Sequence, residues 1–424
     1  MSLFPMAHAA HADWRVAVRE VVQRLRACLA AAWQARRPRL GLVYCTHDYA
    51  ADAGALLSLL ARELPQVSDW AGCSAPGVLA GERAYLRQGA LAVMLLDLPA
   101  AHYRLYSGLV PLGQMGDEAG FIAEQALVHA DGQVPELAEL LQELSVRTSG
   151  GALVGGVGAS QGGGVQFALR AEDFRSQRAG PAAGVLRGGL SGVAWTRAVA
   201  SAARLAHACR PVSPALAVTA AEGALVTELD GQPALTVLLR ALGIAPADGW
   251  RSAVEQLRST FAALAPPGQG LRREALGPLA RVQGIVGIDP RQLGIALSAP
   301  VEPGAQLIFC RLDAPAARRG LMEVGAALRD ALAPELPRPS LASGPACPWT
   351  GSAEGEPSCI RGAIYVSSLE RGELFGGLDV ELRTLSHALG KVPVIGFVAE
   401  PPIMQAGLQR LAGVLTVFPE VEEL

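Results

Sequence analysis

The chain has 424 residues, half of them hydrophobic and 18% charged, with a formal net charge of -3. This length predicts two or three domains, and the small net charge argues against nucleic-acid partners and a polybasic membrane patch. The seven cysteines are scattered and form no C-x-x-C pair, as is usual in a reducing compartment. Neither a secretory leader pattern nor an apolar run of about 18 residues is present, so a cytoplasmic protein is predicted.

A tail and a helix are predicted over residues 1–37. Apolar side chains recur at helical spacing from Trp14 to Trp33 after an N-cap at Asp13, and the arginines of this segment fall largely on the other face. The elements that follow alternate in type. Strands are predicted at 40–45, 67–72, 90–96 and 103–106, a helix at 53–64, two helices within 117–147, and a strand that ends in a glycine-rich turn at 150–160.

The second half of the chain continues this alternation. Trp250, Val254, Leu257, Phe261 and Leu264 have helical spacing and predict a helix. The segment 334–357 is dense in Pro, Gly, Ser and Ala and predicts a mobile loop. Strands are predicted at 215–219, 224–229, 306–312, 362–367, 392–398 and 413–418, and helices at 316–332 and 379–389. The whole pattern indicates an α/β or α+β fold in which mixed β-sheets are covered by helices.

Three stretches repeat one theme, a strand followed by a turn of small residues. LGLVYCT, a helix and VSDWAGCSAPG near the N-terminus correspond to GAIYVSS, a helix and VPVIGFVAEPP near the C-terminus, and GALVGGVGAS shows the theme a third time. The echo predicts two related halves, with chance similarity among Val, Ala and Gly strands as the alternative. If the strands share one direction, the turns at 72–77, 155–160 and 397–400 should gather around one cleft, as ligand sites do in open α/β sheets.

Several ordered blocks resemble the FIST N and FIST C domains. The run HACRPVSPALAVTAAEGALVTELDGQPAL is similar to the junction of the two domains, and AGCSAPGVL is similar to the family's G-C-S-T-x-G turn. GIVGIDP, PGAQLIFCRLDAPAA, RGAIYVSS and VPVIGF resemble later blocks of FIST C. The likeness covers residues 38–418 and implies two related domains, FIST N-like at 38–205 and FIST C-like at 206–424.

The resemblance implies a sensory module that binds a small molecule, with amino acids and other small carboxylates among the expected ligands. Similar bacterial domains occur alone or joined to signalling domains, and here a stand-alone protein acting through a signalling partner supplied in trans is expected. Some members are described as haem-containing nitric oxide sensors, which makes a haem-based gas sensor one alternative, although no cofactor is predicted. A Cys- or Ser-dependent enzyme and a scaffold that binds nothing are two further functions that the sequence leaves open.

The stretch GCSAPG at 72–77 raises four interpretations: a catalytic elbow, a phosphate cradle, a ligand-binding turn or a packing turn. A nucleophile elbow needs G-x-S-x-G, but Pro76 stands where its second glycine should be, and a catalytic Cys73 would need a base that no histidine motif supplies. A phosphate cradle would have more glycines and a Lys-Ser/Thr pair. A ligand-binding turn is therefore favoured, offering backbone N–H groups and the Ser74 hydroxyl, with close packing of small residues as the alternative.

Two arginines are candidate ligand contacts. Arg210 is expected either to clamp a ligand carboxylate or to bond backbone carbonyls between the domains. Arg371 has the same two interpretations, and a solvated ion pair with a neighbouring glutamate, Glu370 or Glu373, is favoured for it. The least unsuitable axial ligand for haem is His47, followed by His207.

The C-terminal turns depart from the family pattern. The family's S-C-x-G-R-G turn appears as SSLERG, with Ser368 in place of cysteine, and its F-x-A-N-G-E-I turn appears as FVAEPPI, where Pro401 and Pro402 remove two backbone donors. These changes disfavour an anionic group, so Glu400 or Glu370 should face the ammonium of a zwitterionic ligand. No catalytic or metal-binding residue is predicted. The predicted ligand-binding residues are Gly72, Cys73, Ser74, Gly77, Gly155, Gly156, Arg210, Ser367, Ser368, Arg371, Gly372, Phe397 and Glu400.

Overall fold

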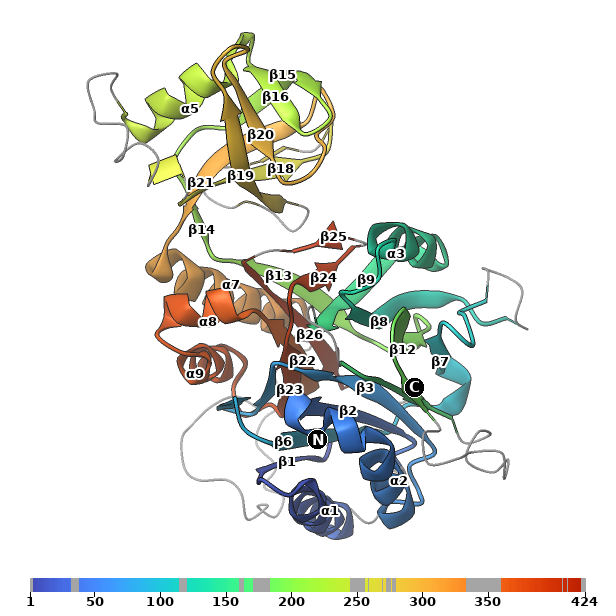
Figure 1. The fold of residues 1–424 in the computed structure, drawn as a ribbon. Coiled ribbons are helices and arrows are strands. Elements are labelled where there is room, and N and C mark those ends of the chain that lie inside the picture. Colours follow the sequence, from blue (N-terminus) through green and yellow to red (C-terminus); the bar gives the residue numbers. More distant parts are fainter. Residues whose placement is uncertain are drawn as a thin grey trace, which may run out of the picture.

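Three mixed β-sheets form the body of the protein, and a β-barrel stands on it (Figure 1). The computed structural model describes residues 3–31, 38–113, 120–159, 164–170, 184–244, 256–257, 259–268, 270–271, 276, 280–332, 360–405, 407–409 and 411–420. The predicted α/β class, with mixed sheets covered by helices, is confirmed. The loop predicted at 334–357 lies outside the described residues.

One strand pattern occurs three times in the body. Each repeat has a parallel strand–helix–strand unit, and a later strand pairs antiparallel with the first strand of that unit. The first repeat consists of β1 (Met6–Ala10), α1 (Trp14–Ala31), β2 (Leu40–Thr46), α2 (Ala53–Glu63), β3 (Asp69–Ala75), β4 (Gly77–Ala80), β5 (Arg83–Leu86) and β6 (Ala90–Leu96). The second consists of β7 (Tyr103–Ser107), β8 (Ala123–Asp131), α3 (Leu137–Val146), β9 (Thr148–Ala159), β10 (Gln166–Leu169), β11 (Val185–Leu186) and β12 (Leu190–Trp195). The third consists of β13 (Ala202–His207), α7 (Ala314–Leu332), β22 (Ile360–Ser367), α8 (Leu369–Phe375), α9 (Leu378–Leu389), β23 (Val394–Val398), β24 (Pro402–Met404), β25 (Gly407–Leu408) and β26 (Ala412–Pro419).

Each repeat passes a hairpin to the sheet of a neighbouring repeat. The hairpin β4–β5 of the first repeat pairs with β23 of the third. The hairpin β10–β11 of the second pairs with β3 of the first, and β24–β25 of the third pairs with β9 of the second. The exchange closes a ring of three sheets with the same strand order, so the two-fold echo expected from the sequence is a three-fold repeat in the structure.

A glycine in the second strand of each unit permits close approach to the first strand. A Cβ atom there would overlap a backbone carbonyl oxygen, which no side chain could avoid. Such a Cβ would lie 1.7 Å from the Val43 oxygen at Gly72, 2.0 Å from the Val128 oxygen at Gly155, and 1.7 Å from the Tyr365 oxygen at Gly396. These three glycines therefore have a role in strand pairing that explains the repeated small-residue theme.

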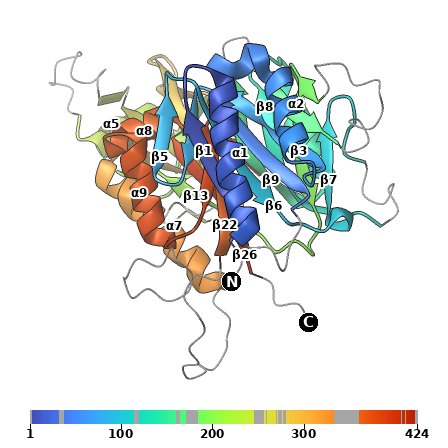
Figure 2. The ribbon, with the colours of Figure 1, turned by 90° about the horizontal axis from the view of Figure 1, so that it is seen from below.

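The inner faces of the three sheets meet in one central core, and helices cover the outer faces. Alternate residues of a strand therefore enter different cores: Tyr44 of β2 lies in the central core, whereas its neighbour Val43 packs with α1 and α2. Figure 2 shows α1 and α2 lying outside the first sheet. Helix α3 covers the second sheet, and α7, α8 and α9 cover the third. Strands covered on both faces explain the continuous apolar runs, such as that at Ala90–Leu96.

The barrel is inserted between β13 and α7 of the third repeat. Its strands β21, β15, β16, β20, β19 and β18 form a closed ring, because β18 pairs back with β21. Its own two apolar clusters fill the interior. The elements are β14 (Cys209–Pro211), β15 (Leu216–Glu222), β16 (Leu225–Leu229), β17 (Gln232–Pro233), α5 (Ala234–Leu242), β18 (Thr260–Ala265), β19 (Arg281–Asp289), β20 (Gly294–Leu297) and β21 (Gln306–Leu312).

Three sequence-based predictions of local structure were wrong. The expected N-terminal tail contains β1, whose Ala7 and Ala9 are buried against α1 at the edge of the first sheet. A strand, β8, occupies much of the region 117–147 where two helices were expected, because it lies between β12 and β9 with both faces covered. Strand β18 replaces the last part of the helix expected at 250–264; its central position between β19 and β21 overrides helical spacing.

Candidate functional site

The three small-residue turns meet where the parallel strand pairs end. Strand β24, which follows Glu400, pairs with β9 through Pro402 and Gly156, and the Glu400 backbone N–H donates to the Val157 carbonyl at 2.9 Å. A Cβ at Gly158 would lie 3.2 Å from the Cys73 sulfur. All three repeats therefore contribute to one junction, in agreement with the expectation that the three turns gather at one place.

We use the name strand-end site for His47, Cys73, Ser74, Asp131, Gln166 and Glu400. His47 directly follows β2, Cys73 and Ser74 lie near the end of β3, and Asp131 ends β8. Gln166 begins the hairpin that the second repeat passes to the first sheet, and Glu400 follows β23. The site is thus built from the ends of strands in all three repeats.

Ser74 and His47 form the polar centre of the strand-end site. His47 Nδ1 lies 3.2 Å from Ser74 Oγ, and the Val165 backbone N–H donates to the same Oγ at 3.0 Å. Burial lowers the pKa of His47, although the charges of Glu400 and Asp48 act in the opposite direction. The imidazole is therefore neutral at pH 7, so Nδ1 can accept a hydrogen bond from the Ser74 hydroxyl.

A small pocket of about 10 Å³, space for about one water molecule, lies beside Ser74. Cys73, Asp131 and Gln166 contribute to its lining. The Gln166 side-chain oxygen is buried and has no hydrogen-bond partner among the described residues, whereas its amide nitrogen donates to Gly189 O at 3.2 Å. Asp131 accepts hydrogen bonds from two backbone N–H groups. The pocket wall therefore presents hydrogen-bond acceptors.

Cys73 does not have the properties of a reactive thiol. It is 1% exposed, and burial raises its pKa well above the usual value, so the thiolate form is disfavoured. Cys73 and Ser74 also belong to a strand rather than a turn, and the Ser74 backbone N–H is already bonded to Val165 O at 2.8 Å. The expectation that Ser74 has a free backbone N–H group for a ligand is therefore wrong. Any contact with a ligand here must be made by side chains.

An aromatic cluster from all three repeats lies in the core next to these strand ends. The rings of Tyr44, His129 and Phe397 have centroid separations of 4.9–5.8 Å, and each side chain is fully buried. The Tyr44 hydroxyl lies 3.1 Å from His129 Nε2. Phe397, a predicted ligand contact, therefore packs in the centre of the molecule.

The predicted glycines mainly serve packing. Gly72 and Gly155 permit the close strand approach described above. Gly156 faces Ala399, where a Cβ would lie 2.5 Å from the alanine Cβ, and a Cβ at Gly77 would lie 2.9 Å from a methyl group of Val398. These residues hold the three repeats together around the strand-end site.

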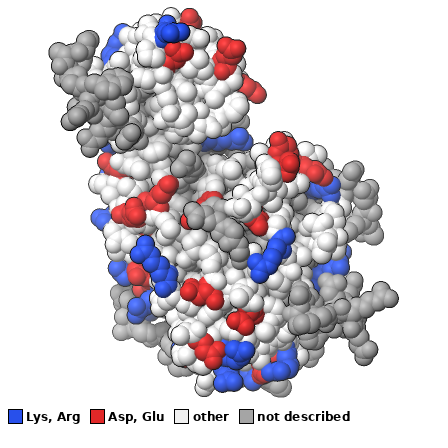
Figure 3. Space-filling model, in the orientation of Figure 1, with Lys and Arg blue, Asp and Glu red and all other residues white. Residues whose placement is uncertain are grey.

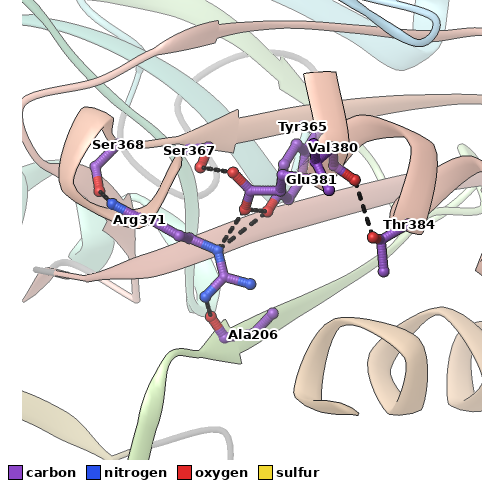
Figure 4. A network of polar contacts seen from close by, with 8 residues as sticks. All are labelled: Ala206, Tyr365, Ser367, Ser368, Arg371, Val380, Glu381 and Thr384. Carbon is purple, nitrogen blue, oxygen red and sulfur yellow. Dashed lines mark hydrogen bonds and ion pairs between the residues drawn. The ribbon is translucent and has the colours of Figure 1, made fainter. Parts of the chain in front are cut away.

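A second group of predicted residues forms a buried polar network beneath α8 and α9 (Figure 4). Arg371 is fully buried and pairs with Glu381, not with Glu370 or Glu373, at 2.5 Å between Nε and Oε1. The expectation of a solvated ion pair is therefore wrong, because α9 supplies a buried carboxylate that sequence proximity did not indicate. Ser367 donates to the same carboxylate at 3.0 Å.

The remaining members of this group support the turn into α8. Ser368 is the N-cap of α8, and its hydroxyl accepts a hydrogen bond from the Arg371 backbone N–H. Gly372 packs closely against Leu378, the first residue of α9. The Arg371 guanidinium also donates to the Ala206 carbonyl at 3.0 Å, which ties α8 to β13. These contacts make the group a structural connection within the third repeat.

Arg210 lies in β14, on the path from the body into the barrel (Figure 1). Its guanidinium pairs with Asp313 at 3.3 Å and its side chain is 54% exposed. Asp313 also caps α7 by accepting from the Ala316 backbone N–H at 2.7 Å. The structure thus places Arg210 at the neck of the barrel, with no described contact to the strand-end site.

Sequence reasoning did not include His47, Asp131 and Gln166 among the ligand contacts. His47 was expected as a haem ligand at most, since no motif made it a catalytic base, and the other two residues lie outside every recognised motif. Alignment of the three repeats on their close-packed glycines would have identified these strand ends, since Thr46, which precedes His47, Asp131 and Ser368 then occupy equivalent positions. Gln166 could not be found in this way, because its position depends on the exchanged hairpin.

Three general features of the described residues bear on the site and its setting. No group of three or more His, Cys, Asp or Glu side chains in this part of the chain is arranged to hold a metal ion. None of the described helices combines the length and the apolar character needed to cross a membrane. Charged side chains of both signs are interspersed over the face seen in Figure 3.

Comparison with known proteins gives matches over most of the chain. Residues 39–232 match the FIST N domain and residues 234–400 match the FIST C domain. Uncharacterized proteins from two Mycobacterium tuberculosis strains, CDC 1551 and H37Rv, are each 30% identical over 338 residues, which is 77% of this chain and 76% of the relative. An uncharacterized Mycobacterium bovis protein is 28% identical over 201 residues, 46% of this chain and 43% of the relative.

Proposed function

This chain belongs to the FIST family, with its N and C domains together, and we propose that it senses a small amino compound at the strand-end site. FIST domains are sensory modules that bind small ligands. We propose that amino acids are among the ligands and that binding is passed in the cytoplasm to a signalling protein supplied in trans.

One observation carries the choice of site. The Ser74–His47 pair lies beside Glu400 at the junction of all three repeats. Because the pocket has space for about one water molecule, a larger ligand would have to move the strand ends of the repeats apart, so binding would change how the repeats pack against one another. A sensory module requires such a link between ligand binding and the arrangement of its parts.

The chemistry of the walls favours a ligand with an ammonium group. Burial lowers the pKa of His47, so the imidazole itself adds no positive charge to the site at pH 7, and the carboxylates of Glu400 and Asp48 lie near it. The Gln166 oxygen and the Ser74 hydroxyl are further groups able to accept hydrogen bonds. An ammonium group supplies donors and positive charge together, whereas a bare carboxylate would meet acceptors of its own sign.

A calorimetric and thermal-shift screen tests this function. Amino acids and small amines should raise the melting temperature, and carboxylates that lack an amino group should not. Glu400→Gln removes the charge but keeps the size, and should weaken an amino ligand by about 1.5–3 kcal/mol, the range for a hydrogen bond to a charged group.

Arg210→Ala is the matched control, because it removes an exposed charge at the neck of the barrel. It should leave the affinity unchanged. A ligand whose binding is lost in Arg210→Ala and retained in Glu400→Gln would contradict the proposed site and support the carboxylate clamp at Arg210.

A serine-dependent hydrolase is the second candidate, because Ser74 and His47 lie within hydrogen-bond reach of each other. We rank it second, since Ser74 is 1% exposed and a substrate carbonyl would have to reach its Oγ. Covalent labelling by a fluorophosphonate that is lost in Ser74→Ala would select this candidate over the sensory module.

A further inference from the structure

A groove runs between α1 and α2 on the outside of the first sheet. It has a volume of about 1010 Å³, and its floor is apolar, formed in part by Trp14, Val18 and Val22 of α1 and by Leu59 of α2. It lies on the outer face of the sheet, whereas the strand-end site lies where the three repeats meet. The groove is therefore a different site from the strand-end site.

The sides of the groove are strongly basic. Four arginines and one glutamate line it, a net charge of +3. Arg26 and Arg62 both pair with the single Glu63, at 2.9 and 3.4 Å, and both remain more than half exposed. In Figure 3 basic side chains, with acidic side chains among them, lie at the lower end of the molecule, where Figure 1 places α1 and α2.

Two of the arginines on α1 have no strong partner inside the protein. Arg19 is exposed and makes no ion pair with any described residue. Arg15 is 54% exposed, stacks over the Trp14 ring at 4.4 Å and approaches Asp13 only to 3.6 Å. Positive charge along one side of the groove is thus available to an acidic partner.

The indole of Trp14 adds an independent indication of a missing partner. Trp14 is 6% exposed, and its Nε1–H has no acceptor among the described residues although it lies at the groove. A buried indole N–H normally finds an acceptor. Because the Nε1 atom is buried, an oxygen of an occupant would reach it only after the indole turns toward the groove.

The length of the groove defines the occupant. The lining residues of α1 extend from Trp14 to Arg26, which is about 18 Å at 1.5 Å per residue, the length of three to four helical turns. We propose that the groove is the docking surface for an amphipathic helix of a partner protein, with its apolar stripe on the floor and its acidic side chains against the arginines. This is the helix-in-groove mode of recognition.

The test uses a fluorescein-labelled 16-residue peptide of Leu, Ala and Glu, with leucines at helical spacing and glutamates beside them, and a matched peptide with Gln for Glu. Fluorescence anisotropy at 50 mM salt should show binding of the acidic peptide and at least tenfold weaker binding of the Gln peptide. The double variant Arg19→Glu, Arg62→Glu should weaken the acidic peptide at least tenfold. Trp14→Phe, which keeps the ring but removes the N–H, should weaken it about tenfold.

Arg240→Glu, an exposed change on α5 of the barrel, is the control and should have no effect. Circular dichroism confirms that each variant is folded. Absence of binding, equal binding of the Gln peptide, or no effect of the double variant would overturn the proposal. So would displacement of the peptide by ATP at equal concentration, which indicates a small-anion site, or a wild-type dimer in analytical ultracentrifugation that the double variant abolishes, which indicates a second copy as the occupant.

Discussion

At the scale of single residues, His129 shows how the central core constrains chemistry. Its ring is fully buried between Tyr44 and Phe397. Burial lowers its pKa from 6.5 to about 3, because a charged imidazole would be removed from water without an opposite charge. The histidine therefore stays neutral in the folded protein over the whole physiological range.

This depressed pKa makes stability depend on pH. Below pH 6.5 the unfolded chain binds a proton at His129 that the folded chain does not, so the free energy of unfolding falls as pH falls, until about pH 3. At pH 5 the loss should be about 2 kcal/mol relative to pH 7.5. His129→Gln should remove this part of the difference, as measured by urea unfolding at the two pH values.

His387→Gln, on the exposed side of α9, is the control and should leave the pH dependence as it is. If His129→Gln shows the same loss between pH 7.5 and 5 as the wild-type protein, the imidazole is not held neutral in the core.

Individual residues were harder to predict from the sequence than the segments that contain them. The motif around Cys73 and Ser74 was identified, but the role of Cys73 depends on complete burial, which a motif does not reveal. Arg371 and Arg210 were both expected to be ligand contacts or structural arginines. Their partners, Glu381 and Asp313, are distant or unremarkable in sequence and follow only from the packing of α9 and α7.

At the scale of elements, the network around Glu381 joins α8, α9, β22 and β13. Tyr365 and Ser367 of β22 donate to the Glu381 carboxylate, and Arg371 of α8 bridges it to β13. Burial alone would lower the pKa of Arg371, but its interactions with Tyr365 and Glu381 raise it overall. The guanidinium therefore remains charged and depends on this carboxylate.

Removing one partner of the buried ion pair should lower the stability of the protein more than replacing both partners. Glu381→Gln leaves a buried guanidinium without its counter-charge and should lower the free energy of unfolding by about 3–5 kcal/mol. The double variant Arg371→Met, Glu381→Met removes both charges and should lose less than the single variant. Chemical denaturation of both proteins measures the difference.

Glu20→Gln, in the exposed pair with Arg24 on α1, should change stability by less than about 1 kcal/mol. The opposite result, a double variant less stable than Glu381→Gln, would contradict this prediction. It would show that the hydrogen bonds of the network stabilise the protein more than the unpaired charge destabilises it.

Most strands of the body were predictable because their apolar runs are long and covered on both faces. The predicted strand at 90–96 agrees with β6 at both ends, and in the barrel the predicted strand at 306–312 agrees with β21. The errors at β8 and β18 arose where Ala, Glu, Gln and Leu favour helix locally but the segment lies between two other strands. The exchanged hairpins could not be predicted, since their partners lie in other repeats.

At the scale of the whole molecule, the three-fold arrangement explains why the small-residue turns recur. Each turn connects a repeat's second strand to a hairpin that belongs to the next sheet, so it must pass close to its neighbours. The sequence showed the theme three times, but only two halves were inferred. The copy that was not recognised as a full unit is the second repeat, because helices were expected where its first strand, β8, lies.

The barrel itself has the properties of an independently folding insertion. Its two apolar clusters are formed by residues 209–312 alone. The chain enters and leaves at adjacent points, since Cys209 pairs with Leu312 and the Asp313 backbone N–H donates to Ala208 O at 3.1 Å. Neither the central core nor the strand-end site includes a barrel residue.

Removal of the barrel therefore tests whether the body alone folds and binds the ligand. Because Cys209 and Leu312 are cross-strand neighbours, an Asn-Gly turn can replace residues 210–311 as a two-residue hairpin. The shortened protein should keep cooperative unfolding, because its central core and helix layers are untouched, and it should keep the response to amino ligands within about twofold. Thermal unfolding and calorimetry measure both. A shortened protein that folds but no longer binds would place part of the ligand site in the barrel, and one that fails to fold would show that the third repeat depends on the insertion it carries.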